Sequence, residues 1–334
     1  MINSKIYIIP ESIKLLKISD EEYFSKSYIS NSSLSLINPE QDGSPKIYHE
    51  GLGEHKKYLE SLEVGTAVHA MILQPESYYI NCSIDKPSGK NFFIVEDIIK
   101  LRKSGKSIYN SIKEAAEKHN YFKNKLTQDV IKKIITNCLS YYKYLYRNPE
   151  KIMPNGKEII YMSSYSRWRT FECIKSIKAS KGYNIINPKG LFSEPIIGKE
   201  DTLVCEIVVE FEGNKVILPL KAKIDNWTLD FESGILTLND LKTTGKELSH
   251  FNDSFRDFHY GRQVAMYLWM LNEYCKVTYN KEFRKFANII TVETSKPFNS
   301  GVFPISTNQI KKGILEFREL ITKVAYCTYY DKWD

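Results

Sequence analysis

Three strand-like segments follow one another with short turns between them, and this run places the strongest limit on the fold. The strands are expected at 203–212, 215–230 and 234–243. The turn Glu212-Gly213-Asn214 predicts a hairpin between the first two. Helical segments come before and after this run. The chain is therefore expected to have an α+β or mixed α/β core, in which a sheet of largely consecutive strands is flanked by helices.

The helices are expected from apolar spacing and from Lys, Glu and Ala content. They are predicted at 33–37, 57–73, 93–103, 107–119, 127–146, 163–181, 258–274 and from 307 to about 330. Leu126-Thr127-Gln128-Asp129 is expected to cap the fifth of them. Two later strands are expected at 286–294 and 301–305. Residues 1–27 are expected to be a peripheral segment with a short strand at 5–10, and residues 28–334 a single domain with a helical insertion around 100–200.

Composition predicts an ordinary globular protein. The chain has 334 residues, 42% of them hydrophobic, and a mean hydropathy of −0.37, which suits one large or two modest domains. Charges interrupt its apolar stretches well short of the ~20 residues that span a bilayer. The N-terminus lacks a basic leader followed by an apolar core and a cleavage site. No membrane association and a cytoplasmic location are therefore expected.

Charge and cysteine usage narrow the class of partner and cofactor. A net charge of +7 and a pI near 8.8 favour a polyanionic partner. Lysines concentrate between residues 99 and 133, where they form either a solvated helix face or a surface for phosphates. The six cysteines are scattered without a Cys-x-x-Cys pair. They are expected to be reduced, and no iron–sulfur cluster is expected.

Asp240-Leu241-Lys242 ends the third strand-like segment, fifteen residues after Asp225. Because side chains alternate along a strand, Asp240 and Lys242 point to the same side, beside Asp225 on the neighbouring strand. Two carboxylates bind a hard divalent cation, and an amine holds or deprotonates water. The simpler explanation of each piece is structural: Asp225 caps a turn, and Asp240 with Lys242 is an exposed strand-end pair.

Two helical segments each carry a pair of residues of interest four positions apart, which places each pair on one helix face. Gly65 and His69 form the first pair, and Gln263 and Tyr267 the second. Taken singly, His69 on an apolar helix is more often a hydrogen-bonded core histidine than a ligand, and Gln263 and Tyr267 are common on helix surfaces. In order, Gly-x-x-x-His, Asp, Asp-x-Lys and Gln-x-x-x-Tyr resemble the RecB-like branch of the PD-(D/E)XK nucleases.

Longer stretches narrow the resemblance to the RecE type, which is exodeoxyribonuclease VIII and its phage relatives. Residues 28–35 resemble the family's opening, where a Ser-rich turn caps a first helix, and residues 64–76 resemble its "GTAVHALLLEPE" segment. Lys221-Ala222-Lys223-Ile224-Asp225 resembles "CKARPD", and Glu206 stands nineteen residues before Asp225, as the family's strand glutamate does. The likeness spans roughly residue 28 to the end and thins between about 140 and 200.

The resemblance implies a PD-(D/E)XK restriction-endonuclease-like core and a Mg²⁺ site at which Mn²⁺ would substitute. The implied metal ligands are His69, Asp225, Asp240, the Leu241 backbone carbonyl and, as an extra ligand, Glu206. The implied catalytic residues are Asp225, Asp240, Lys242, Gln263 and Tyr267. Lys242 would orient and help deprotonate the attacking water, while Tyr260 and Tyr267 would contact the phosphate or stack near the terminal nucleotide.

The implied function is 5′→3′ degradation of one strand of linear double-stranded DNA, which leaves a 3′ single strand for an annealing protein. Relatives of this type act as ring-shaped oligomers, commonly tetramers, in the cytoplasm of bacteria or phage-infected hosts. Three alternatives stay open at this point. They are another RecB-like nuclease that is endonucleolytic or single-strand specific, a non-catalytic DNA-binding protein with this fold, and a metal-dependent enzyme on a small substrate.

Overall fold

The computed structural model describes residues 3–51, 60–121, 127–147, 150–188 and 194–334. Contacts divide the chain into two compact units: residues 1–57 with 175–334, and residues 58–174. This division differs from the expected one at residue 27 and around residues 100–200. The first 27 residues are not peripheral, because β1 (Ser4–Ile8) and β2 (Lys14–Leu16) both pair with β5 (Ile196–Phe211).

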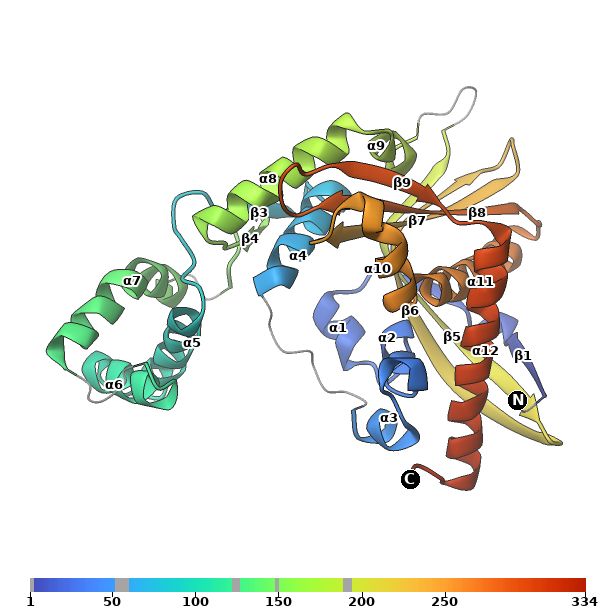
Figure 1. Cartoon of the computed structure of the whole chain (residues 1–334), viewed down its shortest axis with the longest axis horizontal. Helices are drawn as coiled ribbons and strands as arrows, with labels where there is room; N and C mark the ends of the chain where they lie inside the picture. The colour runs from blue at the N-terminus through green and yellow to red at the C-terminus, as the bar shows by residue number, and fades with distance from the viewer. Residues whose placement is uncertain (1–2, 52–59, 122–126, 148–149, 189–193) are drawn as a thin grey trace. The chain divides into compact units, whose positions relative to one another are not determined.

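A mixed sheet forms the centre of the first unit (Figure 1). Among the described residues its strand order is β1-β5-β6-β7-β8-β9, with β2 also on β5. The remaining strands are β6 (Asn214–Asp230), β7 (Ile235–Thr244), β8 (Arg284–Glu293) and β9 (Ser300–Pro304). Strands β7 and β8 are parallel, and the other neighbours are antiparallel. The parallel pair needs a long crossover, and helices supply it.

Helices flank this sheet. The crossover from β7 to β8 holds α10 (Phe251–Asp257) and α11 (Tyr260–Tyr279), and α12 (Thr307–Tyr330) ends the chain. Helices α11 and α12 pack on each other and on one sheet face, where their apolar side chains share one core with strands β5 to β8. Helix α9 (Lys181–Ile186) approaches β8 so closely that a Cβ on Gly182 would lie 2.8 Å from Ile290 Cγ2. Shorter helices precede the sheet: α1 (Asp20–Ser25), α2 (Asn31–Ser35) and α3 (Pro45–Gly51).

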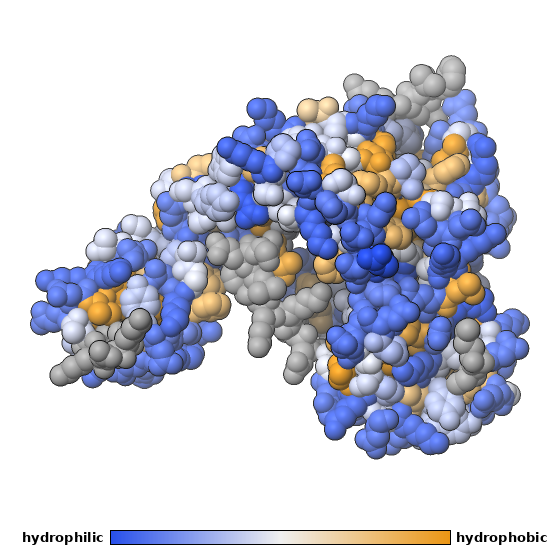
Figure 2. All heavy atoms as spheres, in the orientation of Figure 1, coloured by the Kyte–Doolittle hydropathy of each residue, from blue (hydrophilic) through white to orange (hydrophobic). Residues whose placement is uncertain are grey.

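The unit at 58–174 is mainly helical. It contains α4 (Glu60–Leu73), α5 (Lys90–Lys103), α6 (Ile108–Lys118), α7 (Gln128–Arg147) and most of α8 (Ser164–Ala179), with β3 (Tyr78–Ile80) parallel to β4 (Glu158–Ile160). Helices α5 to α7 enclose a core of their own around residues such as Ile94, Ala115 and Ile134. Their visible face is mostly hydrophilic in Figure 2. A basic, polar surface over a small apolar core is the result.

The mixed α/β core predicted from the sequence is confirmed. The three consecutive strands become β5, β6 and β7, and the turn residues Glu212 and Gly213 take the positive φ values, 48° and 80°, that a tight hairpin needs. Helices α3, α9 and α10 and strands β2, β3 and β4 are additional elements. At the expected cap of α7, Thr127 Oγ1 accepts from the Val130 N–H, and Leu126 lies outside the described residues. The first three residues of the helix expected at 57–73, residues 57–59, also lie outside them. Within the described segments, no helix combines the length and apolarity that crossing a membrane requires.

Candidate active site

Strands β6 and β7 separate at the point where Asp225 lies. Their backbone pairing runs from Asp230 with Ile235 to Asn226 with Asn239. Beyond the pair of Asn226 with Asn239, the Leu241 N–H of β7 donates to the Asp225 side chain, at Oδ2, over 2.7 Å. A carboxylate thus takes the place of a backbone carbonyl of β6 as the acceptor. In a strand, the N–H and C=O of one residue leave on the same edge, so the Leu241 carbonyl faces the Asp225 side as well. This arrangement is consistent with the predicted use of that carbonyl as a metal ligand.

Asp240, Lys242 and Gln263 meet on the face of β7 that α11 covers. Lys242 Nζ lies 2.7 Å from Asp240 Oδ2, and Gln263 Nε2 donates to Asp240 Oδ1 at 3.0 Å. The Asp240 carboxylate is buried, and the Lys242 side chain is largely so. Both carboxylate oxygens of Asp240 therefore contact a donor group, which fixes the side chain. Neighbouring residues of a helix point in different directions. Gln263 of α11 therefore reaches the site while Val264, the next residue, packs in the core.

The charges of this cluster depend on one another. Burial raises the pKa of Asp225, although the Lys242 ammonium and the Leu241 N–H lower it. Burial lowers the pKa of Lys242, but the nearby Asp240 and Asp225 carboxylates outweigh this effect and raise it above its ordinary value. Lys242 thus carries a positive charge between two carboxylates. A divalent cation is the other species that would satisfy such carboxylates in a partly buried position.

Glu200 adds a third carboxylate to the site. The pairs of Lys199 with Asn226 and of Asp201 with Ile224 place Glu200 opposite Asp225 across β5 and β6. A carboxylate oxygen of each lies within 4.8 Å of the other. Glu200 has a positive φ of 50°, so its backbone takes the left-handed conformation that favours glycine. Such a conformation away from a turn is typical of a residue whose side chain position matters.

Lysine 223 balances the charge of Glu200. Its Nζ lies 2.9 Å from Glu200 Oε2 and also contacts Asp20 Oδ1 on α1. Lys223 and Asp225 share one side of β6, because they are two residues apart. The site therefore presents carboxylate oxygens of the kind that Mg²⁺ and Mn²⁺ prefer, from Glu200 and Asp225 within 4.8 Å of each other and from Asp240 beside Lys242.

The structure does not bring Glu206 to this site, and this corrects the ligand set implied by the family resemblance. Glu206 pairs with Pro219 and its side chain is exposed. It lies six residues from Glu200 along β5, which corresponds to about 20 Å of extended chain. The sequence did contain the signal for Glu200: a hairpin that pairs Phe211 with Asn214 puts residue 200 opposite Asp225. The strand predicted from the sequence begins at residue 203 and therefore leaves Glu200 outside it.

The two tyrosines of α11 have different environments. Lys242 Nζ lies 5.3 Å from the centre of the Tyr260 ring, which is half-buried. Tyr267 is 8% exposed and belongs to the core. Burial raises the pKa of the Tyr267 hydroxyl, and the Tyr23 hydroxyl and the Asp240 and Asp225 carboxylates raise it further. The predicted stacking on a nucleotide therefore fits Tyr260 better than Tyr267.

His69 lies on α4, in the unit formed by residues 58–174. It is half-buried, while Ala67, Val68 and Ala70 around it are buried. Its role as a metal ligand stays a prediction from the resemblance.

Replacing Glu200 with Gln is expected to lower metal-dependent cleavage about 10- to 100-fold and to shift the Mg²⁺ titration to higher concentration. The amide keeps the size and the oxygen of the side chain but removes the charge, and comparable changes at metal-supporting groups have effects of this size. Cleavage rates across a Mg²⁺ series test this. Glu206→Gln on the same strand is the matched control and should behave as wild type. Equal effects of the two variants would contradict the placement of Glu200 at the metal.

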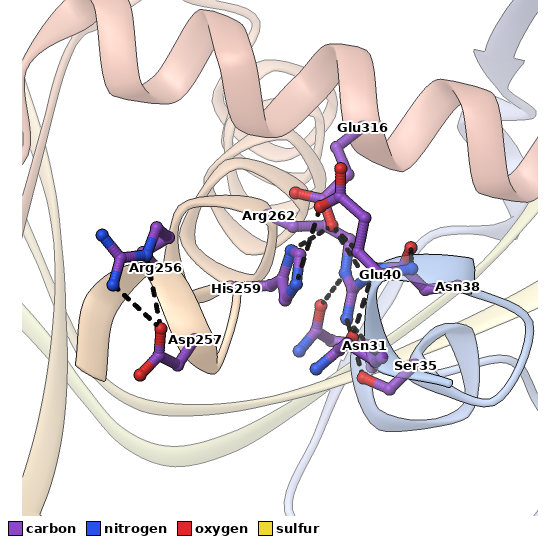
Figure 3. Close-up of polar contacts among 10 residues, drawn as sticks. Asn31, Ser35, Asn38, Glu40, Arg256, Asp257, His259, Arg262 and Glu316 are labelled. Atoms are coloured by element: carbon purple, nitrogen blue, oxygen red, sulfur yellow. Dashed lines mark hydrogen bonds and ion pairs between the residues drawn. The ribbon is translucent and has the colours of Figure 1, made fainter. Parts of the chain in front are cut away.

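Arg262, next to Gln263, anchors the start of α11 (Figure 3). Its side chain is fully buried. Its Nε donates to Asn31 Oδ1 at 2.9 Å, its Nη1 to Glu316 Oε1 at 2.9 Å and its Nη2 to Ser35 Oγ at 2.8 Å. Gly313 on α12 permits the close crossing, because a Cβ there would lie 2.1 Å from Gly261 O. One guanidinium thus joins α2, α11 and α12 and holds the helix that orients Gln263.

Arg262→Met is expected to lower the free energy of unfolding by about 3 kcal/mol. The thioether fills much of the volume, but it leaves buried polar groups on α2 without their donor and Glu316 without its buried cation. The value lies at the low end for a broken buried pair because Glu316 is partly exposed. Urea unfolding measures it. Arg256→Met is the control: Arg256 is exposed and pairs with Asp257, so a change below about 0.5 kcal/mol is expected. Equal losses would refute the anchoring role.

Comparison with known proteins gives a family match to the part of the chain that holds this site. Residues 172–333 match the sequence profile of a family described as a "PDDEXK-like domain of unknown function". That segment holds Asp225, Asp240, Lys242 and Gln263, and the sheet from β5 to β9. This part of the chain has a PD-(D/E)XK-like fold. A search of curated proteins finds no match.

Among solved structures, the chain is similar to a crystal structure of a candidate exonuclease from Eubacterium rectale. The two share 14% sequence identity with a TM-score of 0.44, and the match covers 93% of this chain and 86% of the other.

Proposed function

We propose that this protein is a metal-dependent deoxyribonuclease that hydrolyses phosphodiester bonds. The observation that carries the proposal is the cluster at the divergence of β6 and β7, where Asp225, Asp240 and Lys242 come together and Gln263 holds Asp240. If Lys242 served only in a structural ion pair, a single carboxylate would be enough to balance its charge. Here Asp225 and Asp240 both act on Lys242, and carboxylate oxygens of Asp225 and Glu200 lie within 4.8 Å of each other, which suits a divalent cation.

The residues of the cluster have separable roles. Asp225, Asp240, Glu200 and the Leu241 carbonyl would hold Mg²⁺, which supplies neutralisation of the negative charge that builds on the phosphoryl and leaving oxygens. His69 is proposed as a further ligand on the strength of the family resemblance. Lys242, as an ammonium beside the same carboxylates, would donate a hydrogen bond that orients the attacking water, and its positive charge would favour loss of a proton from that water. Gln263 would keep Asp240 in one rotamer through its 3.0 Å hydrogen bond.

Charge distribution favours a polymeric anion as substrate. Residues 58–174 contain 18 lysines and arginines against 12 aspartates and glutamates, while the rest of the chain contains 29 against 28. Most of the net charge of +7 thus belongs to the helical unit. Its exposed lysines include Lys100, Lys103, Lys113, Lys132 and Lys133. Phosphate contacts from such a surface hold DNA without regard to sequence and weaken as salt rises.

The RecE-type resemblance supports a finer proposal. The enzyme would act as an exonuclease that enters at the ends of linear double-stranded DNA and degrades one strand 5′→3′. Its product would be a 3′ single strand for an annealing protein, and a ring-shaped homo-oligomer such as a tetramer would keep it on the DNA.

Incubation of the purified protein with 5′-labelled linear duplex tests the proposal. Cleavage should require Mg²⁺ or Mn²⁺, stop with a chelator, release label as short products and fall steeply with salt. Duplexes with blocked ends and covalently closed circles should survive. Cutting of closed circles would indicate an endonuclease in place of an exonuclease. Gradual shortening of strands that keep their 5′ label would indicate the opposite polarity. Absence of metal-dependent cleavage on every DNA substrate would refute the proposed function.

A further inference from the structure

A row of four aromatic rings leads from the core to the surface beside Lys242. The ring centres of Phe303 and Phe251 are 4.4 Å apart, those of Phe251 and Tyr260 6.0 Å, and those of Tyr260 and Phe258 5.7 Å. The planes of Phe251 and Phe258 lie 23° and 29° from that of Tyr260, so all three rings are stacked. Exposure rises from 1% at Phe251 to 57% at Phe258. The row thus ends in a phenylalanine whose ring faces solvent.

The same row touches the catalytic cluster. The Lys242 ammonium lies 5.3 Å from the centre of the Tyr260 ring, the ring on which Phe258 stacks. Phe258 is therefore separated from the proposed water-holding lysine by one aromatic ring. A polymer whose phosphate reached Lys242 would pass next to the exposed ring.

The turn that presents Phe258 is held firmly (Figure 3). Phe258 caps the C-terminus of α10, and the following His259 has a positive φ of 52° before α11 begins. His259 Nδ1 lies 2.7 Å from Glu316 Oε1, the oxygen that also accepts from Arg262 Nη1. The Phe258 N–H donates to the Ser254 carbonyl at 3.0 Å, and the His259 carbonyl accepts from the Arg262 N–H at 3.1 Å. The exposed ring is thus preorganised and loses little freedom when it binds a ligand.

We propose that Phe258 is a stacking platform for a nucleobase of the DNA strand being cleaved, and that Tyr260 supports it from below. This inference rests on the proposed nuclease function and extends it to a base-binding subsite. A phenylalanine ring stacks on any base, and because it has no hydrogen-bonding group it reads no sequence. Such a contact would hold the strand in position while it remains indifferent to the sequence degraded.

Binding of DNA with a fluorescent base tests the platform without relying on cleavage. Duplexes with 2-aminopurine at one of the first three positions of the 5′-ended strand are titrated with the full-length protein in chelator. We expect quenching of the fluorescent base at one position with wild type. Phe258→Ala should lose this quenching and bind about 5- to 100-fold more weakly, whereas Phe258→Tyr should keep both. Phe286→Ala, on β8 with a similar exposure of 51%, is the control and should match wild type.

A duplex that lacks the base at the quenched position distinguishes the loss of base stacking on Phe258 from a change in the packing of the protein itself. On this abasic DNA, wild type and Phe258→Ala should bind equally, because no base remains for the ring. Wild-type quenching and affinity in Phe258→Ala would overturn the inference, and so would a loss of affinity that is the same on abasic and intact DNA. Either result would leave the nuclease proposal standing if wild type cleaves DNA. Failure of wild type to bind or cleave any DNA would instead remove the proposed function and this inference with it.

Discussion

Asp240→Asn is expected to reduce metal-dependent cleavage about a thousandfold or more while the protein stays folded. The amide retains an oxygen that can accept from Gln263 Nε2, so the local geometry survives. It removes the negative charge that would bind the cation and that faces Lys242 Nζ at 2.7 Å. Lys242 keeps Asp225 as a counter-charge, which limits the loss of stability. Initial cleavage rates and thermal unfolding, measured together, give both values.

Metal binding should fall in the same variant. Isothermal titration with Mg²⁺ is expected to show weak or undetectable binding to Asp240→Asn at concentrations that saturate wild type. Asp253→Asn, at an exposed carboxylate on α10, serves as the matched control and should keep wild-type cleavage and binding. Near-normal cleavage by Asp240→Asn would show that the metal lies elsewhere, and the assignment of this site would fall.

Lys242→Met is expected to lower the cleavage rate about 10²- to 10⁴-fold, the range for loss of a group that assists proton transfer. Unlike Asp240→Asn, it should retain Mg²⁺ binding or tighten it, because the variant removes a buried positive charge beside the carboxylates. Without metal, the negative charges of Asp225 and Asp240 in this variant are no longer offset by the Lys242 ammonium. The melting temperature should therefore depend more on Mg²⁺ in Lys242→Met than in wild type, since a ligand of the native state stabilises it by mass action.

Thermal unfolding with and without Mg²⁺, beside single-turnover cleavage, tests this pair of expectations. Lys246→Met, four residues further along the chain and half exposed, is the control for loss of a lysine and should change neither quantity. If Lys242→Met cleaved DNA at the wild-type rate, Lys242 would be a structural counter-charge and not part of the chemistry. If it lost Mg²⁺ binding together with cleavage, its role would be to shape the metal site.

Local chemistry made much of the fold predictable. The Gly213 turn and the strand-like runs on each side specify the β5–β6 hairpin within a short stretch of chain. The four-residue spacing of Gln263 and Tyr267 predicted that both face the site while Val264 packs in the core. Gln263 contacts Asp240 and Val264 is in the core, but Tyr267 is in the core as well. By contrast, β2 has three residues, and its partner β5 lies far along the chain. A strand that short has no distinctive pattern of its own, so its existence depends on the sheet edge that it covers.

The sequence by itself determined the identity of the central groups, because Asp225, Asp240 and Lys242 lie at strand positions whose sidedness follows from a period of two. The tertiary structure alone decided which residues join them. Glu200 enters the site and Glu206 does not, because hairpin register sets which residues face each other across two strands. Arg262 is a buried anchor because distant segments supply its acceptors. Distance along the chain does not encode such contacts, since they form only when packing brings separate elements together.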